Sequence, residues 1–297
     1  ALKYGSFHLL HVLSTAPTIE RGDWVARAFG TLVRLGLVLC PLALWGARVF
    51  QRGLVLGLLV GLGGVFALMG PDRLPLLDQL LLVFLASGGC ALIVRSIWAM
   101  LRAGQDELLL GVWALSVVLS VVFAHNYVGG RYLLPAQIPL AIMAVRSLES
   151  RRRGQRWLGV GLLLWVPLGG GLAWSDYRQA KAVEDLATQV TEAWPVGVFT
   201  GEWTFRREME RQGWEKWVPP SALTPGVLLA EPENSSPSAL PATGLELRER
   251  LESADRFPLR ILDQSARIGY QSETLGILPF GFSKSPLEVV RVYEVVQ

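Results

Sequence analysis

The sequence predicts a polytopic α-helical membrane protein with about six transmembrane helices and a C-terminal extracytoplasmic α/β domain. Of the 297 residues, 51% are hydrophobic and 18% are charged, whereas a soluble chain typically carries about 25% charge. Residues 30–174 hold most of the Leu, Val and Gly, while residues 175–297 have the composition of a soluble protein. We therefore expect an extracytoplasmic amphipathic segment over residues 1–29, a transmembrane bundle over 30–174 and an extracytoplasmic α/β domain over 175–297.

Six apolar stretches are the candidate membrane spans. A bilayer-crossing helix needs about 20 apolar residues. The stretches cover residues 30–47, 53–70, 76–100, 107–124, 131–146 and 157–174. The fifth is the shortest and contains Pro135 and Pro139, which a membrane helix tolerates where neighbouring groups satisfy the freed backbone carbonyls. Close helix packing accounts for the glycines within 61–64 and 169–171.

Basic residues alternate between the two sides of the predicted bundle. The loops after the first, third and fifth spans carry Arg48, Arg52, Arg95, Arg102 and a cluster made of Arg146, Arg151, Arg152, Arg153 and Arg156. The intervening loops carry few basic residues. Because Lys and Arg are enriched on the cytoplasmic side, residues 1–29 and 175–297 are expected outside the cell. The basic cluster adjoins a span, so the lipid bilayer and not nucleic acid is the expected partner.

Two opposite charges fall within the predicted spans at similar depth. Arg34 lies near the outer end of the first span, and Asp78 lies near the outer end of the third. Ionisable groups in a membrane are costly and are usually paired or exposed to a wet cavity. The two side chains are therefore either a pair bordering an outward-facing polar cavity or separate anchors that reach the interface.

The polar C-terminal region alternates predicted helices and strands. The expected elements are a helix ending near 193, a strand at 196–199, a helix at 204–212, a strand at 226–230, a Pro/Ser-rich loop at 231–243, a helix at 245–253 and strands at 259–263 and 289–296. Such alternation indicates a small α/β domain of two or three layers. The two cysteines, Cys40 and Cys90, fall in predicted spans, so no disulfide is expected in this domain.

Motifs that would define a catalytic centre are not found in the sequence. There is no phosphate-binding glycine loop, zinc-spaced Cys/His set or nucleophile elbow, so catalytic residues stay unknown and no metal site is predicted. His8 and His11 could share a helix face, but they lack an evident third ligand. Asn234 begins a formal Asn-x-Ser glycosylation sequence.

One segment combines polar chemistry with the predicted outer membrane boundary. It contains His125, Asn126, Tyr127, Arg131 and Tyr132 at the start of the Pro-containing fifth span. Guanidinium groups bind phosphate bidentately, and phenols can donate to phosphate oxygens. The same residue types also anchor spans at the interface. A phosphate site and an interface anchor are both consistent with this chemistry.

The segment Arg-Tyr-Leu-Leu-Pro at 131–135 resembles a motif of GT-C integral-membrane glycosyltransferases. This family includes the protein O-mannosyltransferases and the lipid A aminoarabinose transferases. The stretch Gly-Glu-Trp at 201–203, with Glu-Arg-Gln-Gly at 210–213, and the ending Gly-Ile-Leu-Pro-Phe at 276–280 are similar to further family stretches. The resemblance covers essentially this whole chain, but it corresponds only to the C-terminal half of a family member.

The resemblance implies transfer of a sugar from a polyprenyl-phosphate carrier to an acceptor on the outer face of a bacterial-type inner membrane. Tyr132 matches a family tyrosine that lies beside the carrier phosphate, and Arg131, Asn126 and Tyr127 join it by proximity. The family's acidic catalytic residues, and any divalent metal, belong to an early outer loop. We expect that loop in a preceding segment of a longer polypeptide.

A non-catalytic membrane subunit that reuses the GT-C scaffold within a larger complex is the alternative function. A transporter is a weaker alternative, because the sequence lacks paired, interrupted half-spans. An upstream segment with an acidic outer loop would favour the enzyme, and its absence from the gene would favour the subunit.

Overall fold

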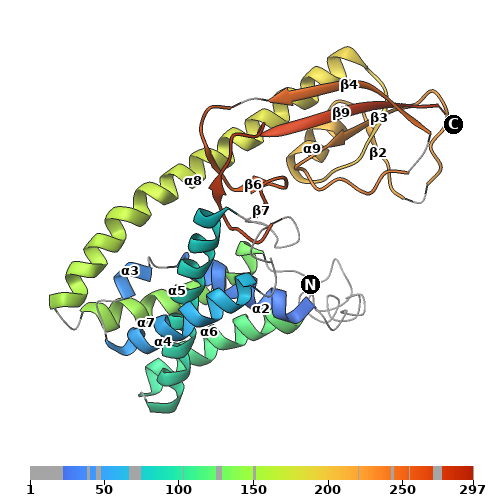
Figure 1. Ribbon diagram of the computed structural model, residues 1–297. Coiled ribbons are helices and arrows are strands. Elements are labelled where there is room, and N and C mark those ends of the chain that lie inside the picture. Colours follow the sequence, from blue (N-terminus) through green and yellow to red (C-terminus); the bar gives the residue numbers. More distant parts are fainter. Residues whose placement is uncertain are drawn as a thin grey trace. The chain divides into compact units, whose positions relative to one another are not determined.

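The computed structural model describes two units of the chain. The described residues are 23–38, 41–44, 48–66, 75–102, 104–124, 129–149, 152–219, 221–241, 244–253, 255–269 and 276–296. The first unit comprises Ala1–Gly169 with Tyr270–Pro279, and the second comprises Gly170–Gly269 with Phe280–Gln297 (Figure 1). The first unit thus includes Tyr270–Pro279, which the expected division at residue 174 assigns to the C-terminal domain.

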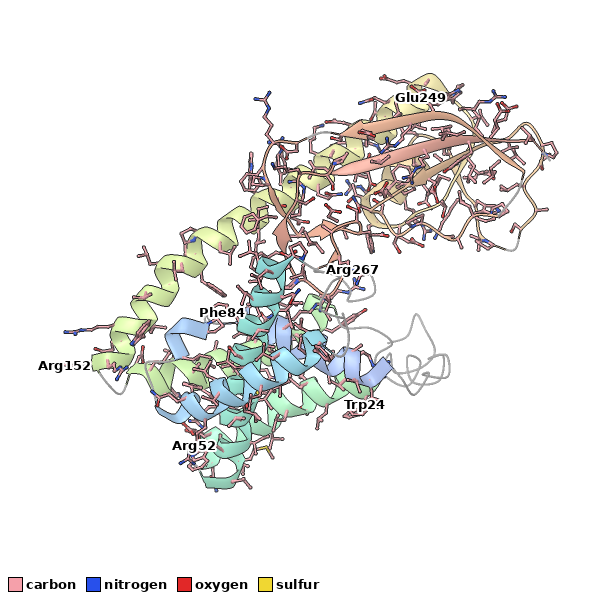
Figure 2. The ribbon with its side chains drawn as sticks, in the orientation of Figure 1. Trp24, Arg52, Phe84, Arg152, Glu249 and Arg267 are labelled. Atoms are coloured by element: carbon pink, nitrogen blue, oxygen red, sulfur yellow. The ribbon has the colours of Figure 1, made fainter. Side chains whose placement is uncertain are left out.

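The described part of the first unit is mainly helical. Its helices are α2 (Asp23–Leu35), α3 (Pro41–Leu44), α4 (Arg48–Gly64), α5 (Leu76–Arg102), α6 (Gln105–Ala124), α7 (Gly130–Glu149) and the beginning of α8 (Arg152–Ala193). Figure 2 shows that carbon dominates the side chains on these helices, whereas nitrogen and oxygen atoms are frequent on the second unit. The two units thus differ in side-chain polarity, as the composition predicts.

Three described helices are long and apolar enough to cross a membrane. They are α5 over Leu76–Leu101, α6 over Gln105–Phe123, and α8. In α4, the apolar stretch Phe50–Gly64 is shorter. These helices support association with a membrane, while the full set of six spans stays a prediction.

The first expected span, 30–47, is divided in the structure. Helix α2 ends at Leu35, a turn follows, and α3 begins at Pro41. A Cβ added at Gly36 would lie 2.0 Å from the Leu85 carbonyl oxygen, so this end of α2 packs directly on the α5 backbone. The Leu37 carbonyl is satisfied by the indole N–H of Trp165, at 2.9 Å, instead of by a continuing helix. Close packing and this long-range hydrogen bond stabilise the break.

A glycine stripe brings α4 against α5. Gly53, Gly57 and Gly61 recur every four residues and therefore share one face of α4. A Cβ added at these positions would lie 2.6 Å from the Cα of Ala91, 2.5 Å from that of Ser87 and 2.9 Å from that of Val83, respectively. Small residues allow helix backbones this close in membranes, where van der Waals packing drives association. The packing role expected for Gly61 is thus confirmed, whereas no atom lies within 4 Å of a Cβ added at Gly63.

A five-stranded mixed sheet forms the centre of the second unit. Its strand order is β2 (Glu215–Lys216), β1 (Val198–Phe199), β3 (Leu228–Pro232), β9 (Glu288–Val295) and β4 (Leu245–Ser253). Strand β1 is parallel to β2 and β3, whereas β9 is antiparallel to β3 and β4. Two further antiparallel pairs join β5 (Leu259–Arg260) to β8 (Gly281–Phe282) and β6 (Leu262–Asp263) to β7 (Ile268–Gly269).

Helices α8 and α9 (Trp203–Arg211) share one hydrophobic core with the sheet. The core contains Val183, Leu186, Ala187 and Val190 of α8, Phe205 and Met209 of α9, Phe199, Trp214, and Ala230, Val290 and Val292 of the sheet. Val290 and Val292 alternate along β9, so their side chains lie on the same sheet face. The observed sheet and helices agree with the predicted α/β class.

The helix predicted at 245–253 is wrong, because this segment is strand β4. Its Leu, Glu and Arg residues have good intrinsic helix propensity. In the structure, the backbone pairs with β9 along the segment, with an irregularity between Leu247 and Glu249. Tertiary pairing therefore overrides local propensity. The exposed charges of this strand also suit the edge of a sheet.

The other expected elements of this unit have counterparts. The predicted helix 204–212 corresponds to α9, and the strands 196–199 and 289–296 correspond to β1 and β9. The predicted strand 226–230 begins later and extends to Pro232, inside the expected loop, and the predicted strand 259–263 is two short strands.

We predict that Gly57→Ala destabilises the first unit whereas Gly63→Ala does not. The methyl at residue 57 would meet the Ser87 Cα at 2.5 Å, and the one at residue 63 has open space. Overpacking costs about 1–3 kcal/mol. Thermal unfolding of both detergent-solubilised variants would measure the difference, and equal stability would contradict the close packing of α4 on α5.

Candidate functional site

Arg131 and Tyr132 contact each other in the first turn of α7. The Arg131 Nη2 donates to the Tyr132 hydroxyl at 2.9 Å, and the guanidinium carbon lies 4.9 Å from the centre of the Tyr132 ring. Arg131 is exposed, while Tyr132 is half-buried and packs against the hydrophobic core of the first unit. The structure therefore brings together a cation and a phenol that the sequence analysis proposed as phosphate ligands.

The start of α7 adds backbone dipoles to this pair. Gly129 and Gly130 are buried, and the Tyr132 N–H donates to the Gly129 carbonyl. Pro135 has no N–H, so the Arg131 carbonyl loses its usual partner four residues later. The aligned N–H groups of a helix N-terminus favour anions. With the guanidinium, this end of α7 is electrostatically suited to a phosphate.

Two other expected carrier-phosphate residues, Asn126 and Tyr127, lie outside the described residues, as do His8, His11 and His125. The proposed role of Asn126 and Tyr127 therefore stays a prediction. Of the four carrier-phosphate residues, the structure places Arg131 and Tyr132.

Arg34 and Asp78 lie in helices that pack closely. Arg34 is in the last turn of α2 and is buried, and its Nη1 donates to the Gly30 carbonyl at 3.3 Å. Asp78 is in the first turn of α5 and is half-buried. A direct pair between the two side chains stays a prediction.

Arg27 is a buried residue that the sequence analysis missed. Its Nε donates at 3.0 Å to the carbonyl of Val122, in the last turn of α6. Carbonyls at a helix C-terminus lack helical partners, and a cation there is favourable. Arg27 thus holds the end of α6 that leads toward α7. The two residues are 95 positions apart, so no local pattern could identify the contact.

Arg95 connects three helices and is not a free charge in a basic loop. Its Nη2 lies 2.6 Å from the Glu107 carboxylate on α6, and its Nε donates at 3.1 Å to the Ser147 hydroxyl on α7. Its Nη1 is buried and has no hydrogen-bond partner among the described residues. A buried ion pair specifies helix arrangement more than it adds stability. We interpret this cluster as a clamp between α5, α6 and α7.

The Gly-Glu-Trp stretch at 201–203 follows β1, at the carboxyl ends of the parallel strands. Gly201 and Trp203 have φ angles of +116° and +58°, and the Trp203 side chain is exposed. Burial opposes ionisation of Glu202, but hydrogen bonds and charge from Lys216 and Arg206 outweigh it and lower the pKa of this carboxyl. Ligands of open α/β sheets often bind at this edge. An ionised, paired Glu202 is not suited to act as a general acid.

Glu288 is a second residue that the sequence analysis missed. Its carboxyl is fully buried in β9 and accepts hydrogen bonds from the Asn234 N–H at 2.7 Å and the Ser235 hydroxyl at 2.8 Å. Burial raises its pKa to about 7, although the Asn234, Ser235 and Val289 donors favour the ionised form. These contacts tie the loop after β3 to β9.

The same loop removes the formal glycosylation site from the surface. Asn234 is buried, and its side-chain nitrogen donates to the Leu287 carbonyl at 2.9 Å. Its side-chain oxygen accepts from the Gln264 N–H at 3.0 Å. Both ends of the amide are thus used in packing, so the folded domain does not present this residue for modification.

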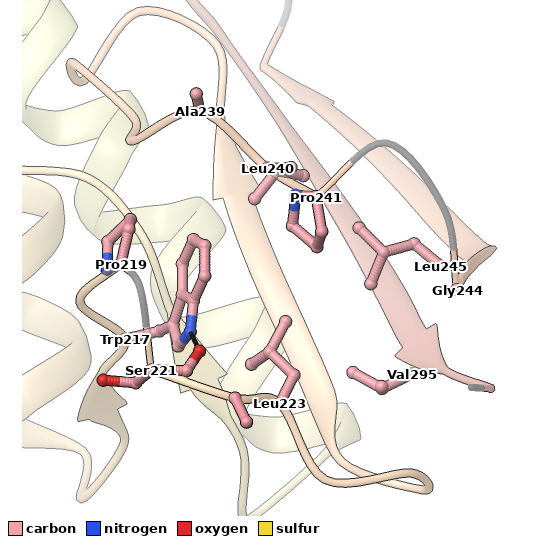
Figure 3. Close-up of a pocket in the computed structure, with 11 residues that line it drawn as sticks. Trp217, Pro219, Ser221, Leu223, Ala239, Leu240, Pro241, Gly244, Leu245 and Val295 are labelled. Carbon is pink, nitrogen blue, oxygen red and sulfur yellow. Dashed lines mark hydrogen bonds between the residues drawn. The ribbon is translucent and has the colours of Figure 1, made fainter.

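A cavity of about 400 Å³ lies in the second unit (Figure 3). It is lined by Trp217, Pro219, Ser221, Ala222, Leu223, Ala239, Leu240, Pro241, Gly244, Leu245 and Val295. The Trp217 indole N–H is held by the Ser221 carbonyl at 2.9 Å, which orients the ring as one wall. Polar and apolar atoms both contribute to the lining, but none of the lining side chains is an acid or a base, so the cavity does not provide acid–base chemistry.

Among the described residues, no group of three or more His, Cys, Asp or Glu side chains is arranged to hold a metal ion. The described chain therefore offers positive charge and hydrogen-bond donors at α7, and it does not assemble a set of acidic ligands there. Phosphate binding is the chemistry that this site supports best.

We predict that Glu288 makes the stability of the second unit depend on pH. Its folded pKa of about 7 is raised above the usual 4.5, so its contribution is complete below pH 4.5 and is lost as pH rises through 7. Between about pH 5 and pH 8 the local unfolding free energy should fall by up to about 3 kcal/mol. Hydrogen exchange of β3 and β9 amides, corrected for intrinsic rates, would measure this change.

Glu288→Gln cannot titrate and should flatten that pH dependence. Glu249→Gln, on an exposed position of β4, is the matched control and should leave it intact. An unchanged pH slope in Glu288→Gln would show that another group is responsible.

Comparison with known protein families, characterised proteins and solved structures finds no significant match for this chain. The resemblance to GT-C glycosyltransferases therefore rests on the residues of the chain itself. The geometry at the start of α7 is the basis for a functional proposal.

Proposed function

We propose that this chain is part of a GT-C-type membrane glycosyltransferase that uses a polyprenyl-phosphate-linked sugar. The observation that carries the proposal is the contact between Arg131 and Tyr132 in the first turn of α7. The acceptor would lie on the outer face of a bacterial-type inner membrane. Three span-length apolar helices support the membrane location.

Arg131 and Tyr132 would act on the leaving phosphate. In an inverting displacement, the bond between the anomeric carbon and the phosphate oxygen breaks while the acceptor oxygen attacks that carbon. Negative charge then increases on the phosphate, where preorganised donors are most effective. The guanidinium can donate to phosphate oxygens, and the Tyr132 hydroxyl, which accepts from Arg131, can direct its own proton to the same group. No general base is assigned.

A non-catalytic membrane subunit is the second candidate function. The packing of the Tyr132 ring on the core of the first unit favours it, because that contact gives the residue a structural role without any ligand. In this case Arg131 would cover the ring as a cation–π partner at the membrane boundary. The two functions predict different effects of substitution.

We predict that the second unit lies outside the cell, because basic residues cluster near the junction of α7 and α8. In intact spheroplasts, an impermeant maleimide should label Gln212→Cys, and it should not label Gln155→Cys. Both side chains are exposed, and the background should lack Cys40 and Cys90. Labelling with the opposite sidedness would invert the proposed orientation.

We predict that Arg131→Ala and Tyr132→Phe weaken binding of a polyprenyl phosphate. Loss of a hydrogen bond to a charged group costs about 1.5–3 kcal/mol, which corresponds to roughly 10- to 150-fold in affinity. Titration of the complete protein in detergent would measure the affinity. Arg146→Ala, at the other end of α7, is the matched control. If Arg131→Ala and Tyr132→Phe lowered thermal stability and left the affinity unchanged, the result would support the non-catalytic subunit and contradict the carrier-phosphate site.

A further inference from the structure

The apolar stretch of α8 ends at two exposed aromatic residues. Residues 157–174 are predominantly apolar, and Ser175 begins the polar continuation of the helix. The side chains of Trp174 and Tyr177 are 50% and 58% exposed, and their ring centres are 5.5 Å apart. Trp and Tyr concentrate where membrane helices meet water. These two rings therefore mark the level at which α8 would leave a bilayer.

A loop of the second unit lies against this end of α8. The Arg178 Nη2 donates to the Asp255 carboxylate at 2.8 Å, and the Phe257 N–H donates to the same oxygen at 3.1 Å. The Asp255 side chain is only 4% exposed, so it is a fixed acceptor. The Arg178 guanidinium carbon lies 6.0 Å from the Trp174 ring centre. Asp255 and Trp174 thus orient Arg178.

Helix and loop together line an open cavity of about 530 Å³. Its lining is Trp174, Arg178, Asp255, Arg256, Phe257 and Pro258. Two guanidinium groups and one carboxylate give the lining a net positive charge. Arg256 is exposed, and Phe257 and Trp174 supply apolar surface. The cavity therefore combines cations with aromatic carbon at the end of an apolar helix.

We propose that this cavity binds the phosphate of an anionic phospholipid headgroup, in the leaflet where α8 leaves the membrane. Arg178 and Arg256 donate to the phosphate oxygens, and Trp174 contacts the glycerol and the first acyl carbons. Lipid is favoured over soluble phosphate because the site continues into the apolar stretch of α8. The proposal requires α8 to cross the membrane, and it does not depend on glycosyl transfer.

The test is titration of the complete detergent-solubilised protein with dihexanoyl phosphatidylglycerol, dihexanoyl phosphatidylcholine and inorganic phosphate, by calorimetry. We expect phosphatidylglycerol to bind about ten-fold more tightly than phosphatidylcholine, and Arg256→Gln to lose that preference. Arg211→Gln, an exposed arginine on α9, is the matched control and should retain it. Trp174→Ala should weaken the binding of both lipids.

Arg256 is exposed and has no hydrogen-bond or ion-pair partner within the described part of the chain, so its substitution should leave thermal unfolding unchanged. Equal affinity for the two lipids in the unsubstituted protein would overturn the proposal. Inorganic phosphate that binds as tightly as phosphatidylglycerol would also overturn it, because the ligand would then be soluble phosphate. If Arg211→Gln lost the preference for phosphatidylglycerol as much as Arg256→Gln does, the preference would come from general surface charge.

Discussion

Close approach of helix backbones around α5 is the constraint on which the first unit depends. Gly53 and Gly57 of α4 leave no room for a side chain against α5, and Gly89 of α5 lies even closer to the Leu32 carbonyl of α2. Lipid is as apolar as the helices, so helix association in a membrane depends on such contacts and on polar links between helices. The bonds from Arg27 to Val122 and from Arg95 to Glu107 are links of this kind. They fix α2 and α5 against α6, the helix that precedes α7 in the chain.

The second unit depends instead on a mixed sheet with a shared helical core. Strand β9 is important in this sheet, because it pairs with both β3 and β4, contributes Val290 and Val292 to the core, and carries the buried Glu288. Glu288 holds the loop after β3, in which Asn234 of the formal glycosylation sequence is buried. At the sheet edge, β4 is charged and irregular, features by which natural proteins discourage pairing with another chain. The hydrogen bonds to this carboxyl thus fix the loop after β3 against β9.

Both proposed ligand sites combine an arginine with an aromatic ring near the end of an apolar helical stretch. At α7, Arg131 lies over Tyr132, and at α8, Arg178 lies near Trp174. The two arrangements differ in how the arginine is oriented. A buried carboxylate fixes Arg178, whereas the neighbouring phenol contacts Arg131. A cation oriented by protein groups loses less freedom when it binds a phosphate, and this preorganisation increases affinity.

The sequence by itself determined the difference in polarity between the two parts of the chain, the α/β class of the C-terminal region and the adjacency of Arg131 and Tyr132, because hydropathy, periodicity and adjacency are local properties. Only the tertiary structure decided the break in the first expected span, the strand at 245–253 and the contacts of Arg27, Arg95 and Glu288. Each of these features depends on a partner far away in the chain. Gly36, at the break, packs on the α5 backbone, β4 pairs with β9, and Arg27 donates to the Val122 carbonyl. Their free energies exceed the local preferences that a sequence pattern records, so the pattern alone could not identify them.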